Sequence, residues 1–176
     1  MSADNRLSSW ITGLMRENYD AVGFIPEPTV RDRYIRRELY LLQKDSRGNR
    51  IGYLLHGPIE PGKPVVVSQH CIQYEKRMLG YGRSTFKELL KRCRQGGASS
   101  IHLRCADDLP AVQFWQTCGF QVSKVTPGGQ KRHRMIIEMN MLLNLPLFER
   151  DCAQYQRIVD ELRRANERER TNGNAG

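Results

Sequence analysis

The chain has 176 residues, of which 39% are hydrophobic and 27% are charged, and its formal net charge is +9. These proportions are typical of one folded globular domain and exclude a disordered or collagen-like chain. No apolar run approaches the ~18 residues that cross a bilayer, and charges interrupt residues 1–19, so we expect no membrane span, no secretory signal and a cytoplasmic location. Five cysteines without a C-x-x-C pair indicate reduced thiols, with neither a disulfide framework nor a metal site. The positive charge favours an anionic partner or is a solvated basic surface.

In chain order, the first half predicts two helices, a β-hairpin and a central strand. Ser8 or Ser9 can cap a helix, because apolar residues follow at helical spacing before the prolines at 26 and 28. A short basic helix follows over residues 29–37, with a capping-box pattern at its start. The expected strands are 38–44 and 50–57, joined as a hairpin, and 65–72, whose β-branched start is typical of a central strand.

The second half alternates helices and strands and then ends in a charged segment. After the glycines at 80 and 82, apolar residues fall at helical spacing up to Gly96. The remaining expected elements are a strand at 99–105, a helix capped by Asp108 and ended by Gly119, strands at 121–126 and 132–141, and a helix at 149–170. We therefore expect one α/β layered domain over residues 1–148, a separate C-terminal helix, and a flexible tail at 171–176.

One segment between the central strand and the following helix has the composition of an anion site. It reads Arg77-Met78-Leu79-Gly80-Tyr81-Gly82-Arg83, and we call residues 77–83 the cradle. Glycine lets the backbone approach a ligand closely, and the free N–H groups at a helix start favour a bound diphosphate. A strand-to-helix turn also favours glycine without any ligand, so this motif needs a second signal.

The second signal lies one strand further along, as Asp108-x-x-Ala111-x-x-Phe114-Trp115-x-x-x-Gly119-Phe120. Together, the two motifs resemble the GNAT superfamily of N-acetyltransferases, whose pattern is R/Q-x-x-G-x-G/A, a strand, and then N-x-x-A-x-x-x-Y-x-x-x-G-F. The match covers residues 65–120 closely. It implies a mixed, mostly antiparallel central sheet flanked by helices, to which this chain adds a C-terminal helix.

The resemblance also implies acetyl-CoA as the cofactor. Its diphosphate would bind the cradle, and its pantetheine arm would lie between two splayed strands, 65–73 and 99–105. Backbone N–H groups near Cys71 and Ile72 would hold the pantetheine and the acetyl carbonyl, as in an oxyanion hole. Lys76, Arg77 and Arg83 either add charge toward the phosphates or belong to the solvated surface. The implied cofactor contacts are Cys71, Ile72, Arg77, Met78, Leu79, Gly80, Tyr81, Gly82, Arg83, Asp108 and Trp115.

The catalytic residues depart from the family pattern. Trp115 replaces the tyrosine that protonates the leaving thiolate. Its indole N–H can orient sulfur but cannot act as an acid, and core filling is the alternative. Asp108 replaces the usual asparagine. Strand alternation places Ser68 and His70 on one side, where His70 is the better general base and an ordered water is the alternative. His56 and His102 lie in strands that could also border the cleft.

The resulting hypothesis is an acetyl-CoA-dependent N-acetyltransferase that works by direct attack of an amine. Basic stretches occur at 31–37 and 131–134, outside the cradle. The resemblance implies that these segments border the acceptor cleft, so we expect an acidic or phosphate-bearing acceptor, whose identity the sequence does not specify. One alternative is a nucleic-acid-binding or nucleic-acid-modifying protein that uses the same basic patches. Another is a non-catalytic family member. A homodimer is also left open.

Overall fold

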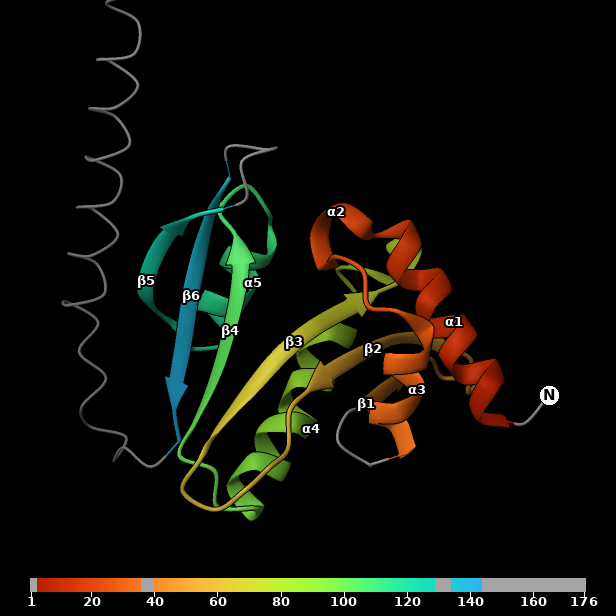
Figure 1. Ribbon diagram of the computed structural model, residues 1–176, viewed down its shortest axis with the longest axis horizontal. Coiled ribbons are helices and arrows are strands. Elements are labelled where there is room, and N and C mark those ends of the chain that lie inside the picture. The colour runs from red at the N-terminus through yellow and green to blue at the C-terminus, as the bar shows by residue number, and fades with distance from the viewer. Residues whose placement is uncertain (1–2, 36–39, 129–133, 144–176) are drawn as a thin grey trace, which may run out of the picture.

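The computed structural model describes residues 3–35, 40–128 and 134–143 (Figure 1). They form a six-stranded sheet in the order β1-β2-β3-β4-β6-β5. The strands are β1 Tyr40–Lys44, β2 Arg50–His56, β3 Pro64–Ile72, β4 Ser100–Ala106, β5 Gln121–Pro127 and β6 Met135–Leu142. The β3–β4 pair is parallel and every other pair is antiparallel. The expected mixed, mostly antiparallel sheet is therefore confirmed.

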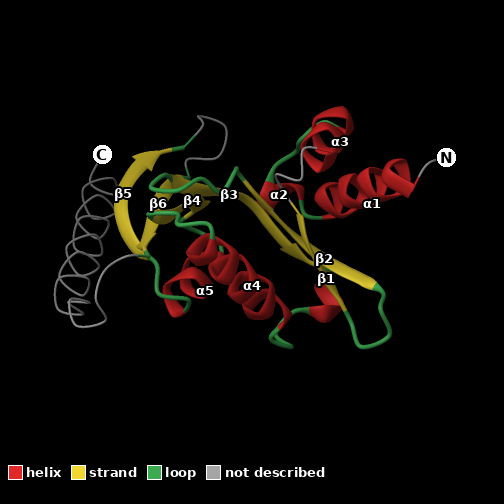
Figure 2. Ribbon diagram, turned by 90° about the horizontal axis from the view of Figure 1, so that it is seen from below, coloured by secondary structure: helices red, strands yellow, loops and turns green. Residues whose placement is uncertain are grey.

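Helices cover both faces of this sheet (Figure 2). The helices α1 Ala3–Glu17, α2 Tyr19–Val22 and α3 Glu27–Ile35 lie on one face. The helices α4 Tyr81–Gln95 and α5 Ala111–Thr117 lie on the other. The short helix η1 Tyr74–Lys76 connects β3 toward α4. The elements expected between residues 38 and 141 all occur, with boundaries shifted by a few residues.

Each face has its own apolar core. Under α4 and α5, the core includes Phe86, Leu89 and Trp115. Under α1 and α3, it includes Ile11, Met15 and Tyr53, each of which is fully inaccessible to solvent. These two cores hold the helices against the sheet, whose central strands β3 and β4 pair along only part of their length. No helix in the described part of the chain is long and apolar enough to cross a membrane.

Two helix starts in the first third of the chain differ from the sequence-based prediction. The first helix begins at Ala3, so Ser8 and Ser9 lie inside it, and their hydroxyls donate to Glu27 at 3.0 and 2.7 Å instead of capping. That contact joins α1 to the start of α3, which is Glu27 instead of residue 29. The helix expected at 149–170 and the tail at 171–176 lie outside the described residues.

Candidate active site

The central strands β3 and β4 pair along only half of their length. Backbone partners run from Pro64 with Ser100 to Val67 with Leu103, and beyond Val67 the two strands diverge. Figure 1 shows β3 and β4 separating as the arms of a V toward their carboxyl ends. We call the space between the arms the gap. It is the splay that the family resemblance implied for these two strands.

A β-bulge in β3 marks the point where the gap opens. Leu55 pairs with Gln69 and His56 with Val67, so Val67 and Ser68 both stand opposite His56. The extra residue resets the alternation of side chains. Val67 and His70 consequently face α4 and α5 together, so the simple alternation from which Ser68 and His70 were placed on one side does not hold across the bulge. Ser68 is exposed on the bulge.

Beyond the bulge, alternate backbone N–H groups of β3 point into the gap. The Gln73 N–H donates to the Ile51 carbonyl on β2 at 2.8 Å. Because successive N–H groups of a strand point in opposite directions, the Cys71 N–H also faces β2, where Cys71 stands opposite Tyr53. The N–H groups of His70 and Ile72 face the other way, toward the gap. This geometry favours His70 and Ile72 over Cys71 as the backbone donors to a ligand.

The cradle presents a second set of free donors. Met78 has φ 60° and is fully exposed, and Gly80 has φ 82° as the residue before α4. The Ser84 N–H donates to the Gly80 carbonyl at 3.0 Å and closes the first turn of α4. The N–H groups of Tyr81, Gly82 and Arg83 therefore precede the first helical hydrogen bond. This is the arrangement that binds anions at a helix N-terminus.

His70 lies beside the cradle, on the face of β3 that packs against α4 and α5. Its ring centroid is 5.7 Å from that of Phe114 and 5.4 Å from that of Trp115. A Cβ added to Gly82 would lie 3.4 Å from His70 Cε1, so ring and cradle are in contact distance. Its Nε2 is buried without a partner among the described residues, and burial lowers the pKa of His70 to about 4. The imidazole is therefore neutral near pH 7.

Trp115 occupies the centre of the aromatic cluster under the sheet. It is 5% exposed, and its ring centroid lies 5.5 Å from that of Phe86, 4.9 Å from that of Phe114 and 5.2 Å from that of Phe120. These edge-on contacts are favourable aromatic geometry. Core packing accounts for Trp115 without a catalytic role.

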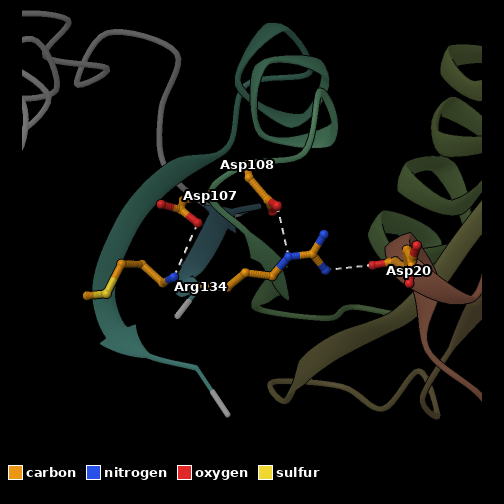
Figure 3. A network of polar contacts seen from close by, with 5 residues as sticks. Asp20, Asp107, Asp108 and Arg134 are labelled. Atoms are coloured by element: carbon orange, nitrogen blue, oxygen red, sulfur yellow. Dashed lines mark hydrogen bonds and ion pairs between the residues drawn. The ribbon is translucent and has the colours of Figure 1, made fainter. Parts of the chain in front are cut away.

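Asp108 does not cap α5, contrary to the prediction. The helix starts at Ala111 after Pro110, and the Asp108 carboxylate instead accepts from Arg134 Nε at 2.8 Å. Arg134 Nη1 also donates to the Asp20 carbonyl at 2.8 Å, as Figure 3 shows. Asp20 belongs to α2 beside the β3 arm, and Asp108 follows the β4 arm. Arg134 thus bridges the open end of the gap.

The cationic side chains of the cradle have protein partners. Arg77 donates to the Ile72 carbonyl at 3.0 Å and to Asn18 Oδ1, and Arg83 donates to Thr117 Oγ1 at 3.3 Å. The sequence pattern did not indicate Asn18, nor Gln69, whose Nε2 donates to the Val22 carbonyl at 2.8 Å. A polar residue at the end of an amphipathic helix, and a glutamine within an apolar strand, are the signals that could have found them.

Two further histidines, His56 and His102, have hydrogen-bond partners within the protein. His56 is 4% exposed and its Nδ1 is 2.6 Å from the Gly57 carbonyl. Burial lowers the pKa of His56. His102 Nε2 is 2.9 Å from Ser100 Oγ. Within the described part of the chain, no three metal-ligating side chains come together.

Comparison with known proteins identifies the fold. No protein-family model matches the chain, and no curated protein does. Ard1 from Thermoplasma volcanium is similar in structure with a TM-score of 0.69 at 13% identity, covering 79% of this chain and 93% of its own. The ribosomal-protein-S18-alanine N-acetyltransferase from Escherichia coli gives 0.64 at 13% identity, covering 85% and 94%. The Salmonella typhimurium protein yncA, a putative acetyltransferase with its cofactor acetyl-CoA, has a TM-score of 0.65 at 16% identity. The match covers 86% of this chain and 97% of yncA.

The chain therefore has the fold of the GNAT N-acetyltransferases, as its two motifs predicted. In this chain the cradle lies before α4 and the second motif lies around α5.

Proposed function

We propose that this protein transfers an acetyl group from acetyl-CoA to an amine. The observation that carries the proposal is the junction of two donor sets. The free N–H groups of Tyr81, Gly82 and Arg83 begin α4, while those of His70 and Ile72 face the gap beside it. A diphosphate matches the first set, and the amides and carbonyl of an acetylated pantetheine arm match the second. The cofactor bound in yncA supports this assignment.

The chemistry is a direct transfer. Acetyl-CoA supplies a thioester whose carbonyl carbon is attacked by the amine, so that a C–N bond replaces the C–S bond. The acceptor must first lose a proton, because an ammonium has no lone pair. The backbone N–H groups of His70 and Ile72 would stabilise negative charge on the carbonyl oxygen. The cradle would fix the far end of the cofactor and so orient the thioester.

His70, Ser68 and Trp115 would have different roles in the reaction. His70 is neutral and can accept a proton, although a base with a pKa of about 4 holds it weakly, and the alternative is an ordered water that passes the proton on to solvent. His70 would then serve as a neutral hydrogen-bond partner beside the cofactor. Ser68, exposed on the bulge, can orient that water. Trp115 packs against the His70 ring and does not donate a proton.

Binding and transfer test the proposal directly. We expect calorimetry and native mass spectrometry to show one CoA per chain, and acetyl-CoA mixed with a panel of amines to give acetylated products. No binding at millimolar CoA would contradict the proposal. Binding of CoA without transfer to any amine would favour a non-catalytic member of the fold. Salt-sensitive binding of RNA in the absence of acetyl-CoA would favour the nucleic-acid alternative.

We also propose an acidic or phosphate-bearing acceptor. The support is the net charge of +9 and the basic stretches at 31–37 and 131–134. Arg31 is exposed on α3, whereas Arg36, Lys131 and Arg132 lie outside the described residues. Charge near an acceptor cleft raises the local concentration of an oppositely charged substrate.

Charge reversal tests the acceptor class. Changing Arg33, Arg36, Lys131 and Arg132 together to glutamate should raise the acceptor KM and leave acetyl-CoA affinity nearly unchanged. The KM of the unaltered protein should climb with salt, because exposed charges are screened. Efficient acetylation of spermidine that ignores all four reversals would show that these side chains are only solvated surface.

A further inference from the structure

Segment 18–22, which contains α2, lies beside the open end of the gap, and Val22 at its end packs against the core under α1 and α3. None of the α2 residues is buried, and Tyr19 is 56% exposed. Polar contacts also hold the segment. Three side chains from three other elements donate hydrogen bonds to it, and each of these elements borders the gap: the bulged strand β3, the cradle, and the start of β6.

Two of these contacts fix the segment to the arms of the sheet. Gln69 Nε2 donates to the Val22 carbonyl at 2.8 Å, and the buried Tyr53 hydroxyl donates to Gln69 Oε1 at 3.0 Å, which orients the amide. Arg134 joins the Asp20 carbonyl to Asp108 on the other arm, as described above (Figure 3). Both contacts end on backbone carbonyls of the segment.

The third contact begins in the cradle. Arg77 Nη2 donates to Asn18 Oδ1, while Arg77 Nε donates to the Ile72 carbonyl at 3.0 Å. The guanidinium carbon lies 5.3 Å from the centre of the Tyr74 ring. The Asn18 amide is itself oriented, because its Nδ2 donates to the Leu14 carbonyl at 2.9 Å. The Arg77 guanidinium thus reaches segment 18–22, on the face opposite α4.

The Ile72 carbonyl places the Arg77–Asn18 contact next to the proposed cofactor site. Like the Ile72 N–H, it points away from β2 and therefore toward the gap. A pantetheine arm in the gap would lie against this carbonyl and would compete with Arg77 Nε for it or share it. Any shift of the guanidinium would be transmitted to Asn18 at the other end of the same planar group.

We propose that Arg77 is a positioning residue that couples the cofactor site to segment 18–22, and that it is not a ligand of the cofactor phosphates. This inference rests on the proposed function. It makes acetyl-CoA occupancy and the placement of segment 18–22 energetically linked through Arg77 and Asn18. Linkage is reciprocal, so a variant that breaks the contact should change both the response of the segment to cofactor and the use of acceptor.

A double-mutant cycle with Arg77→Ala and Asn18→Ala tests the coupling. Hydrogen exchange of the amides in segment 18–22 should be faster in both single variants without cofactor. Acetyl-CoA should slow exchange in the unaltered protein and should do so much less in either variant. We expect the acceptor KM to rise about five-fold or more, within the usual range of coupling energies, and CoA affinity to fall by a similar factor in both single variants, because linkage is reciprocal. The double variant should be no worse than either single one.

Two control variants separate this role from general effects. Arg92→Ala removes the same charge from α4, where Arg92 pairs with Glu88 at 3.0 Å, and should change neither exchange nor KM. Asn18→Asp keeps the oxygen that accepts from Arg77 and should retain the coupling. Circular dichroism confirms that each variant is folded.

The outcomes distinguish this proposal from the proposed function. A large loss of CoA affinity in Arg77→Ala, with a weaker salt dependence and an unchanged acceptor KM, would make Arg77 a phosphate ligand and overturn the coupling alone. Additive effects in the cycle would also overturn it. Failure of the unaltered protein to bind CoA would instead overturn the proposed function, and with it the coupling.

Discussion

Replacing Gly82 with aspartate is expected to abolish acetyl-CoA binding, with a loss of affinity of about 100-fold or more. Gly82 is the second residue of α4, where its N–H precedes the first helical hydrogen bond. A carboxylate at this position can accept from the same free N–H groups that would bind the diphosphate, and it repels the phosphates. Acidic residues are favourable in the first turn of a helix, so the variant should fold. Titration calorimetry with CoA measures the loss.

The matched control is Gly82→Ala. Its Cβ would lie 3.4 Å from His70 Cε1 and 3.5 Å from the Phe114 ring, which is ordinary contact, so a methyl group fits. We expect CoA affinity within a few-fold of the unaltered protein. Equal affinity in Gly82→Asp and Gly82→Ala would remove the cradle from the cofactor site. Equal and severe loss in both would indicate a steric effect instead of competition for the N–H groups.

The parts of this molecule that the sequence predicts are those with local causes. The helix after Gly80 follows from apolar residues at helical spacing, and the strand at 65–72 follows from its β-branched residues. Because the two motifs also occur in order with one strand between them, they predict the fold and the place of the cradle. These features depend on neighbours within a few residues along the chain.

The features that escaped prediction have causes far along the chain. The bulge at Ser68 exists only in the pairing of β3 with β2, and no single residue signals it. Arg134 donates to the Asp20 carbonyl, 114 positions earlier, and to the Asp108 carboxylate, so both Arg134 and Asp108 lie at the open end of the gap. The sequence left Arg77 as either a phosphate contact or solvated surface, and its contact with Asn18, 59 positions earlier, was not predicted. Side-chain direction at a loop depends on partners that only the fold brings near.

The bulge also changes the chemistry expected of His70. With simple alternation, its imidazole would stand with Ser68 and be open to a substrate. The inserted residue turns it instead toward Phe114 and Trp115, where desolvation disfavours the charged form. Its pKa of about 4 is then a property of the folded state alone, because an unfolded histidine titrates at 6.5. This difference links protein stability to pH.

His70 should therefore make the protein acid-sensitive over a defined range. Between pH 6.5 and 4 the unfolded chain binds a proton at His70 that the folded chain does not, so its contribution to the free energy of unfolding falls as pH falls through this window and is constant above it. The full difference is an upper bound of about 3 kcal/mol at pH 4. Urea unfolding from pH 4 to 8 measures the effect.

The variant His70→Leu keeps an apolar side chain of similar size in the aromatic pocket and removes the unpartnered Nε2. It should be at least as stable as the unaltered protein at pH 7, because an unsatisfied buried nitrogen is lost, and its relative advantage should grow toward pH 4. A stability difference that is flat across this range would refute the buried, neutral imidazole.

The variant His70→Leu also tests whether His70 is the general base. A general base would cost about 100-fold in turnover and remove a low-pH limb, whereas a water base leaves the limb in place, set by the acceptor amine.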